Sequence, residues 1–372
     1  MYRRKAQTDV FVVGGGPAGL AAAIAARRKG FAVTVADGVE PPIDKACGEG
    51  MMPETQAALR ELGVTVPSGA GYGFRGIRFV QGETRVAAEF PEGQGIGIRR
   101  TALHGLLIRE AEKCDVQMLW KTPVVGIGDD GVRLSSGTVS ARWIVGADGG
   151  HSRVRRWSEL DSLVSNSHRL ASRRHYRVRP WTEFAEIYWA PRVQVYVTPI
   201  STEEVCIVAM GETPEDADFA GAFSLLPELR ERLAGAELCS RERGAITAMQ
   251  SFARVWRGNV ALVGDASGGV DAITGDGMRL AFRQAYALAD AMRGGDLREY
   301  GFAHKQLSRR PLWMGRLMLR LGKYDGLRSR MFKMLSRNPR SFAQLLAIHV
   351  GHATTRDVVA TGAQLGWQFL AS

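Results

Sequence analysis

The sequence of 372 residues is poor in cysteine and lacks a long apolar run. Cys47, Cys114, Cys206 and Cys239 are far apart, form no C-x-x-C pair and have no histidine nearby at the spacing of metal ligands. Neither a disulfide framework nor a metal site is therefore expected. No stretch reaches the apolar length of a membrane-spanning helix, and the short apolar run after MYRRK lacks the cleavage site of a secretory signal. These absences predict a cytoplasmic protein.

Acidic residues are scarce in one segment. Between Lys305 and Arg340 there are eleven Lys or Arg residues and one acid, Asp325, so this segment carries +10 of the net charge of +11. The chain has no aromatic-studded basic strand or known reader motif, so nucleic-acid binding is not expected. One interpretation is a helical cap with a solvated basic face. The alternative is that 305–340 contacts a membrane surface, an acyl carrier protein or another acidic partner.

The strongest positive signal is the stretch from Asp9 to Asp37. The apolar run Val10–Val13 is typical of a parallel strand buried on both faces, and GGGPAG follows it directly. An alanine-rich helix is predicted over Pro17–Arg28. A second strand over 32–36 ends at Asp37, whose carboxylate can accept hydrogen bonds from ribose hydroxyls. This βαβ pattern predicts that the chain binds an adenosine diphosphate group.

The glycines of this stretch occupy the positions of a dinucleotide-binding loop, G-x-G-x-x-G. Gly14 allows the tight turn, Gly16 lets a pyrophosphate approach the backbone, and Gly19 lets the helix lie close to the sheet. Pro17 and Ala18 begin the helix, whose positive end faces the phosphates. NAD and FAD share this fingerprint. No second copy of it follows, so the chain has no dedicated NAD(P)H domain.

A second motif lies in ARWIVGADGGHSRVRRW. The strand predicted over 143–145 runs into Asp148 and Gly149, and Ser152 caps the helix that follows. A carboxylate at a strand end, followed by glycine and a capped helix, is a ligand-facing arrangement in nucleotide-binding folds. Alone it is also compatible with a structural turn, but it gains specificity after the glycine fingerprint.

The third motif follows a buried strand over 260–263 and leads into a long helix that reaches about Met292. Its helix N-terminus offers backbone N–H groups to negative charge. The residues of this motif that we expect to bind cofactor are Gly264, Asp265, Gly275, Asp276, Gly277 and Met278.

These motifs resemble the FAD-dependent oxidoreductases of the glutathione-reductase type, in the group of p-hydroxybenzoate hydroxylase, geranylgeranyl reductase and the flavin-dependent halogenases. The resemblance covers roughly residues 8–300 and implies FAD as the bound cofactor. It implies that NAD(P)H, or a partner, reduces the flavin. Members of the group usually have proline in the loop before the third helix, where this chain has Ala272 after Asp271. The resemblance also implies that Asp265 binds a ribityl hydroxyl of FAD.

The resemblance also assigns residues outside the three motifs. The loop PPIDKACGEGMMP is similar to a K-x-C-G segment of the reductase branch that lies beside the flavin ring. Lys45, Cys47 and Gly48 are therefore implied near the flavin, and Cys47 is the candidate for a catalytic group. Arg100, with Arg99 as the alternative, is implied to contact the phosphate or ribityl part of FAD. Val125, in the strand predicted over 124–127, completes the implied cofactor set.

The strand and helix patterns predict an α/β fold: a Rossmann-type FAD-binding domain with an inserted antiparallel β-sheet substrate domain and a C-terminal helical region. The predicted divisions are 1–65, 98–160 and 256–300 for the FAD-binding domain, 66–97 and 161–255 for the substrate domain, and 301–372 for the basic helical region.

Inside the substrate domain, 223–233 is predicted as one helix. Tyr188, Trp189 and Tyr196 are candidate pocket walls, although aromatic residues on strands are more often core residues.

The reaction is less defined than the cofactor. We expect an NAD(P)H-dependent flavin monooxygenase that hydroxylates an electron-rich small-molecule, carrier-bound or peptide-bound substrate. The CGEGMMP loop favours the alternative, a geranylgeranyl-reductase-like ene-reductase. A flavin-dependent halogenase and a flavin electron carrier without turnover remain further alternatives. The sequence shows no obvious acid–base pair, since His151, His168 and His175 are each compatible with surface positions.

Overall fold

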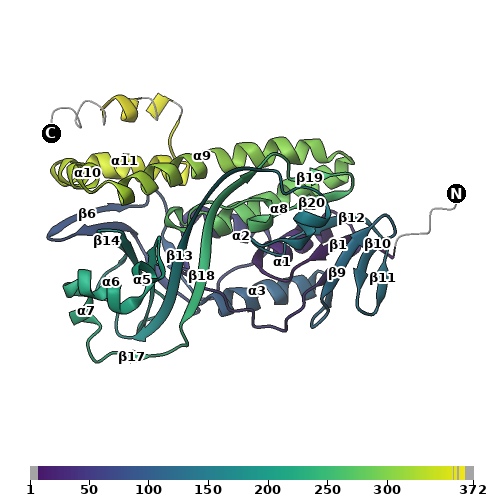
Figure 1. The fold of residues 1–372 in the computed structure, drawn as a ribbon, viewed down its shortest axis with the longest axis horizontal. Coiled ribbons are helices and arrows are strands. Elements are labelled where there is room, and N and C mark those ends of the chain that lie inside the picture. The colour runs from purple at the N-terminus through teal and green to yellow at the C-terminus, as the bar shows by residue number, and fades with distance from the viewer. Residues whose placement is uncertain (1–6, 355, 358–359, 365–372) are drawn as a thin grey trace.

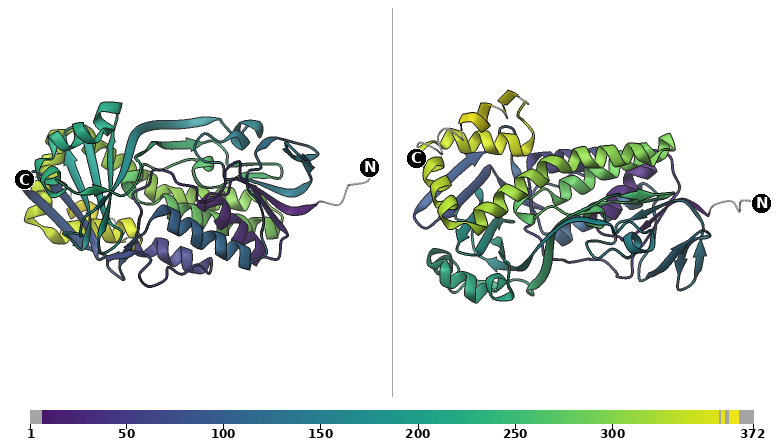
Figure 2. Two further views of the ribbon diagram at one scale, coloured as in Figure 1. Left: turned by 90° about the horizontal axis from the view of Figure 1, so that it is seen from below. Right: turned by 45° about the horizontal axis from the view of Figure 1, so that its top comes forward.

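The computed structural model describes residues 7–354, 356–357 and 360–364 (Figure 1). The predicted domains extend over 1–6, 355, 358–359 and 365–372, which lie outside the described residues. The molecule is elongated, with a nucleotide-binding half toward the N-terminus and a β-sheet half covered by the C-terminal helices (Figures 1 and 2).

The nucleotide-binding half is built on a six-stranded sheet. In order across the sheet, the strands are β19 (Trp256–Arg257), β20 (Val260–Leu262), β12 (Ala141–Gly146), β1 (Thr8–Val13), β2 (Val33–Ala36) and β8 (Gln117–Leu119). All neighbours pair in parallel except β19, which is antiparallel to β20. β1 is apolar throughout Val10–Val13 because both of its faces are covered.

Helices cover one face of this sheet and a small sheet covers the other. The helices of the first face are α1 (Pro17–Arg28), α2 (Pro53–Glu61), α3 (Arg100–Lys113) and α8 (Gly277–Gly294), whereas the short helix α4 (Arg153–Trp157) lies beside the small sheet on the other face. The small sheet consists of β9 (Val124–Gly128), β10 (Gly131–Leu134) and β11 (Gly137–Val139). The alanines of α1 are almost fully buried against α8 and the sheet, because small side chains let the helices approach closely.

The second half is an eight-stranded sheet. Its strands are β17 (Glu237–Leu238), β18 (Arg243–Phe252), β13 (Leu163–Arg177), β16 (Glu204–Gly211), β15 (Val193–Pro199), β14 (Phe184–Ala190), β5 (Gly76–Gln81) and β6 (Thr84–Glu89). The long strand β13 pairs with β16, β17 and β18, and the pair β14–β5 is parallel whereas the other pairs are antiparallel. A separate short sheet joins the halves through β3 (Gly50–Met51), β7 (Gly95–Gly97) and β4 (Tyr72–Phe74).

Short helices pack on the outer face of the eight-stranded sheet. They are α5 (Pro214–Ala217), α6 (Phe219–Leu225) and α7 (Pro227–Arg232). The single helix predicted over 223–233 is wrong. The chain breaks at Leu226 because Pro227 starts a new helix and disfavours helical geometry in the residue before it.

The C-terminal helices close the other face. This part contains the 3₁₀ turns η1 (Gly264–Ser267) and η2 (Ala272–Thr274), and the helices α9 (Leu297–Lys323), α10 (Asp325–Arg337) and α11 (Pro339–Val350). α9 starts before the predicted boundary at 300/301, and the buried Tyr300 donates a hydrogen bond to the carbonyl of Leu262, at 2.5 Å. The C-terminal helices are therefore continuous with the nucleotide-binding core.

A histidine links α9 to the turn η1. His304 Nε2 lies 3.0 Å from Ser267 Oγ, and burial lowers the pKa of His304 from 6.5 to about 4. The unfolded chain therefore binds a proton at a higher pH than the folded chain does. Protonation of the unfolded chain therefore lowers the free energy of unfolding as the pH falls below 6.5. At neutral pH this loss is absent.

We predict that His304→Gln makes the free energy of unfolding less dependent on pH between pH 7 and pH 5. Lowering the pH from 7 to 5 should reduce the free energy of unfolding of the variant by less than that of the wild type, with a difference on the order of 1 kcal/mol. Urea unfolding at both pH values and fixed FAD concentration measures it. Equal losses in the two proteins would show that His304 is not a buried neutral group.

Candidate active site

One cavity of about 970 Å³ lies between the two halves of the molecule. This volume is at the upper end of the range for ligand sites. The part toward α1 is lined by glycine-rich loops and polar groups, which we call the loop half of the cavity. The part bounded by the eight-stranded sheet and α9–α11 is mostly apolar, and we call it the apolar half.

The loop after β1 forms a cradle at the N-terminus of α1. A Cβ added to Gly14, which has a φ of 109°, would lie 2.5 Å from the carbonyl oxygen of Ala147, and one added to Gly19 would lie 1.8 Å from the carbonyl oxygen of Gly14. These two glycines are required by packing. At Gly16 the same Cβ meets no atom within 4 Å, and Gly16 lines the cavity. The cradle thus leaves open space where the α1 N-terminus meets the cavity.

Buried polar side chains hold this loop in place. His104, fully buried in α3, donates from Nε2 to the carbonyl of Gly15 at 2.8 Å. The backbone N–H of Gly15 donates to Asp37 Oδ2 at 2.7 Å. Burial lowers the pKa of His104, which keeps its ring neutral. No pattern in the sequence indicated His104, because its partner is a backbone carbonyl 89 residues away.

A second helix N-terminus meets the same cavity. α8 begins after Asp276 with no side-chain cap, and both Gly277 and Met278 line the cavity. The preceding loop is fixed by an ion pair in which Arg169 Nε donates to Asp271 Oδ2 at 3.0 Å. Asp271, which directly precedes Ala272, is thus anchored from β13.

Thirteen of the twenty predicted cofactor-binding residues line the cavity. They are Gly16, Pro17, Ala18, Lys45, Cys47, Gly48, Arg100, Gly149, Gly264, Asp265, Gly275, Gly277 and Met278. The seven that do not line it are Gly14, Gly19, Asp37, Val125, Asp148, Ser152 and Asp276.

Several of these seven have a structural explanation. Asp148 accepts hydrogen bonds from the hydroxyl of Ser152 and from two backbone N–H groups of α4, so it caps that helix. Asp276 is buried and accepts from Arg279 Nε at 2.6 Å. Val125 departs most from the predicted set, since it lies on β9 with 55% of its side chain exposed. The structure gives its side chain no contact with the cavity.

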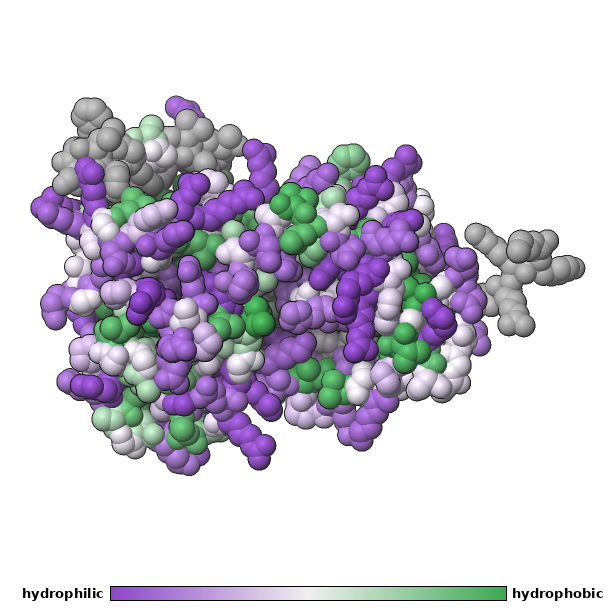
Figure 3. All heavy atoms as spheres, in the orientation of Figure 1, coloured by the Kyte–Doolittle hydropathy of each residue, from purple (hydrophilic) through white to green (hydrophobic). Residues whose placement is uncertain are grey.

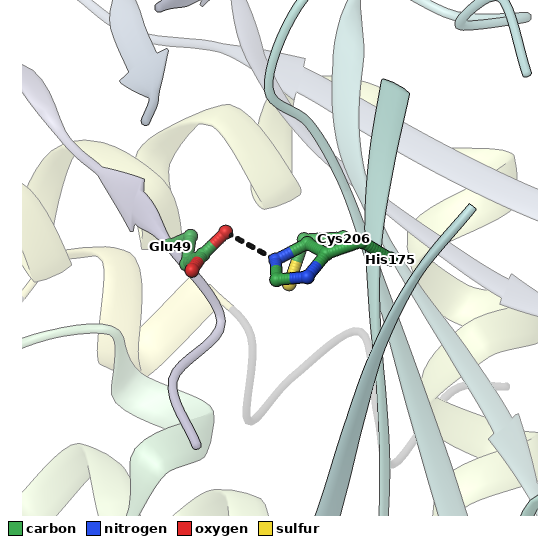
Figure 4. A group of neighbouring side chains, drawn as sticks. All are labelled: Glu49, His175 and Cys206. Atoms are coloured by element: carbon green, nitrogen blue, oxygen red, sulfur yellow. Dashed lines mark hydrogen bonds and ion pairs between the residues drawn. The ribbon is translucent and has the colours of Figure 1, made fainter. Parts of the chain in front are cut away.

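The sequence analysis missed a buried group behind Cys47. His175, on β13, is fully buried rather than at the surface, and its Nε2 lies 2.7 Å from Glu49 Oε2. Figure 4 shows the two side chains pointing toward each other, with Cys206 beside them on the neighbouring strand β16. His175 was missed because its partner is 126 residues away in the chain.

Glu49 joins the Cys47 loop to its surroundings. Its Oε1 accepts from the backbone N–H of Arg100 at 2.9 Å, and its own N–H points to Cys47 Sγ at 3.4 Å. Its φ of 59° is rare for a residue other than glycine and is tolerated between Gly48 and Gly50. The Glu49–His175 pair therefore fixes the backbone that carries Cys47.

The chemistry around this group suits a hydrogen-bonded network better than a metal. Glu49, His175 and Cys206 bring one ligand atom each within 4.8 Å of one another. However, guanidinium nitrogens of Arg99 and Arg173 lie 2.5 and 3.0 Å from His175 Nδ1. Positive charge this close opposes cation binding. Burial lowers the pKa of His175 and raises the pKa of the Cys206 thiol, so both are neutral.

The apolar half is lined from both the sheet and the C-terminal helices. Of the three aromatic residues proposed as walls, Tyr196 lines the cavity. Trp189 is a core residue on the same side of the sheet, and Tyr188 is a core residue on the opposite side. Burial raises the pKa of Tyr196, which remains a phenol. Further apolar wall residues are Phe79, Ile187, Met210, Ile273, Met314, Leu317, Met318, Leu321, Phe332, Phe342 and Leu346.

The residues of the loop half suit an FAD molecule. Two uncapped helix N-termini and the open space at Gly16 provide a site for a diphosphate. Asp265 is exposed and lines the cavity, where it can accept hydrogen bonds from hydroxyl groups. Nε of Arg100 is buried without a hydrogen-bond partner among the described residues. An anionic, hydroxyl-bearing cofactor satisfies all of these groups.

A parallel sheet with a glycine cradle, covered by a second sheet across one large cavity, defines a Rossmann-type flavoprotein. The chain belongs to the FAD binding domain family, whose family model matches residues 7–293. It is therefore an FAD-dependent oxidoreductase.

Similar proteins support this assignment. The chain is 29% identical over 328 residues to a menaquinone reductase of Mycolicibacterium smegmatis, covering 80% of this chain and 79% of that protein. It is 26% identical over 313 residues to a digeranylgeranylglycerophospholipid reductase of Methanothrix thermoacetophila, covering 77% and 79%. The fold is similar to that of a flavoprotein/dehydrogenase from Cytophaga hutchinsonii, with a TM-score of 0.79, 21% identity and 92% coverage of both chains.

We predict that Gly16→Val folds but no longer retains FAD. A Cβ at this position has no protein atom within 4 Å, so the valine should be tolerated by the fold and should occupy the space left at the α1 N-terminus. FAD affinity should fall by roughly 100-fold or more, which is about 3 kcal/mol of binding energy. The flavin absorbance of the purified protein relative to its protein absorbance measures the change.

Gly326→Val, where an added Cβ also has no atom within 4 Å, is the matched control for this prediction. It should retain FAD, since Gly326 lies in α10 away from the cradle. Full flavin content in Gly16→Val would contradict our placement of the cofactor diphosphate.

Proposed function

We propose that this protein is an FAD-dependent reductase that saturates a carbon–carbon double bond in the isoprenoid chain of a lipid. The observation that carries the proposal is the apolar half of the cavity, which continues from the loop half and is closed by α9–α11. This favours the reductase alternative over the hydroxylase expected from the sequence.

The wall of the apolar half argues for an uncharged, hydrocarbon-rich substrate. Among the described residues that line it from the eight-stranded sheet and α9–α11, there is no lysine or arginine. A small aromatic acid would lack a cation there to offset the cost of burying its carboxylate. An isoprenoid chain has no such cost and gains free energy by burying its apolar surface.

The names of the relatives point in the same direction. One is named for the reduction of menaquinone and the other for the reduction of digeranylgeranylglycerophospholipid. Both compounds are lipids that carry isoprenoid chains, although their head groups differ. We infer that the shared part, the unsaturated chain, is the part that enters the apolar half here.

The proposed reaction needs a hydride for one alkene carbon and a proton for the other. The loop half would hold FAD, and the reduced cofactor would supply the hydride after reduction by NAD(P)H. Cys47 lines the cavity and is our candidate for the proton donor, with the proton leaving Sγ for carbon and being replaced from water. The Glu49 N–H near Cys47 Sγ would stabilise the thiolate left behind. The Glu49–His175 pair holds that N–H in position.

We predict that the anaerobic protein, after addition of NADPH or NADH, transfers reducing equivalents to a geranylgeranyl lipid. Flavin absorbance should bleach with one of the two donors and return on addition of the lipid. The product should contain two additional hydrogens by mass spectrometry. The fully saturated lipid is the control and should leave the flavin reduced.

Other outcomes would identify the alternatives. Flavin that reoxidises only in air, with an oxygen atom gained by an aromatic substrate, would replace the reductase with a hydroxylase. Flavin that neither donor reduces would indicate an electron carrier served by a partner protein.

We further predict that Ala185→Phe weakens binding of the lipid substrate without affecting binding of FAD. Ala185, on β14, lines the cavity and packs against the apolar cluster that contains Phe79 and Phe332. The added ring should displace part of the substrate chain and raise KM for the lipid roughly tenfold, as expected when more than 1 kcal/mol of apolar contact is lost. FAD content and the rate of reduction by NAD(P)H should stay unchanged. Loss of FAD instead would show that the two halves are not distinct.

A further inference from the structure

The helix α9 has two faces of opposite character. Its inner face lines the apolar half of the cavity through Met314, Leu317, Met318 and Leu321. Its outer face is exposed and belongs to the basic segment 305–340. Figure 1 shows α9 running along one edge of the molecule, with the sheets beneath it.

The outer face combines cations with aromatic side chains at helical spacing. The cations of 305–323 are Lys305, Arg309, Arg310, Arg316, Arg320 and Lys323, and this segment contains no Asp or Glu. None of the six forms a salt bridge with another described residue. The exposed aromatic residues within or beside this segment are Phe302 and Trp313 on α9, with 69% and 51% exposure, and Tyr324, which directly follows the helix, with 54%.

This composition is unusual for a face that only meets water. Phe302, Trp313 and Tyr324 are three of the ten large hydrophobic residues that the described part of the chain exposes. Hydrophilic side chains with apolar ones between them follow the edge where α9 lies (Figure 3). Tryptophan and tyrosine, as at Trp313 and Tyr324, favour the head-group level of a bilayer, and lysine and arginine favour its anionic phosphates.

We propose that the outer face of α9 docks on the surface of an anionic membrane. The interleaving of cations with single aromatic side chains along one helix face favours a bilayer over an acidic protein, whose contact would have a contiguous apolar centre. None of the described helices is both long enough and apolar enough to cross a bilayer, so the contact would be peripheral.

Docking through the outer face of α9 would place the apolar half of the cavity close to the membrane. The helix that would rest on the bilayer is also a wall of the cavity, so a lipid leaving the membrane would meet the apolar half directly behind it. The docking surface itself is inferred from its own residues, independently of the proposed reaction. Its test therefore uses binding and not turnover.

The experiment measures flotation of the FAD-loaded protein with vesicles of phosphatidylcholine, with or without phosphatidylglycerol. The wild type should float only with the anionic vesicles. Arg316→Glu/Arg320→Glu should weaken binding by roughly 30-fold or more, since each basic side chain at an anionic surface contributes roughly fivefold. Trp313→Ser should also weaken binding to the anionic vesicles. Its effect should be larger at high salt, where the attraction between charges is screened.

A matched control separates this face from net charge. Arg109→Glu/Arg241→Glu makes the same change in charge at exposed arginines on α3 and before β18, near the opposite edge of Figure 1. It should bind vesicles like the wild type. Both double variants should keep their flavin absorbance and far-ultraviolet circular dichroism.

Three results would overturn the proposal. The wild type could remain unbound to the anionic vesicles. The two double variants could lose binding equally, which would make the attraction a property of overall charge. The protein could bind polyglutamate as tightly as vesicles and without dependence on Trp313, which would indicate an acidic polypeptide partner instead.

Discussion

The close packing of α1 against β12 and α8 is the constraint on which the site depends. Gly14 and Gly19 leave no room for a Cβ, and the alanines of α1 are almost fully buried. This packing brings the N-termini of α1 and α8 to one cavity, where both lack side-chain caps. Backbone N–H groups and helix dipoles thus converge where a diphosphate and a flavin edge carry negative charge.

The apolar half of the cavity is continuous with the loop half. The eight-stranded sheet has two apolar faces, of which one is covered by α5–α7 and the other by α10 and α11. On the second face the packing is incomplete and leaves the apolar half of the cavity open to the cradle loops. The C-terminal helices therefore shape the apolar half, where we propose that the substrate binds, and α9 lies between it and the molecular surface. In this account, membrane docking and substrate binding use opposite faces of one helix.

The sequence predicted the parts of this structure that depend on local patterns. The FAD-binding fold, α1 and the glycine cradle follow from apolar runs and glycine spacing over short distances. The Glu49–His175 pair could not be found in this way, because long-range folding alone brings its members together. Met314 and Leu321 recur at helical spacing in the sequence, but helical periodicity does not distinguish a core-facing residue from one that lines a cavity. Asp148 was placed at a strand end correctly, yet its carboxylate caps α4.

The central claim is that one cavity holds FAD in its loop half and an isoprenoid chain in its apolar half. A crystal structure of the protein with FAD and a geranylgeranyl lipid tests it most directly. The account predicts the diphosphate at Gly16, and the lipid chain between Tyr196 on β15 and Met318 on α9, with one double bond against the flavin ring. A lipid chain bound elsewhere, or a flavin whose diphosphate lies away from α1, would contradict it.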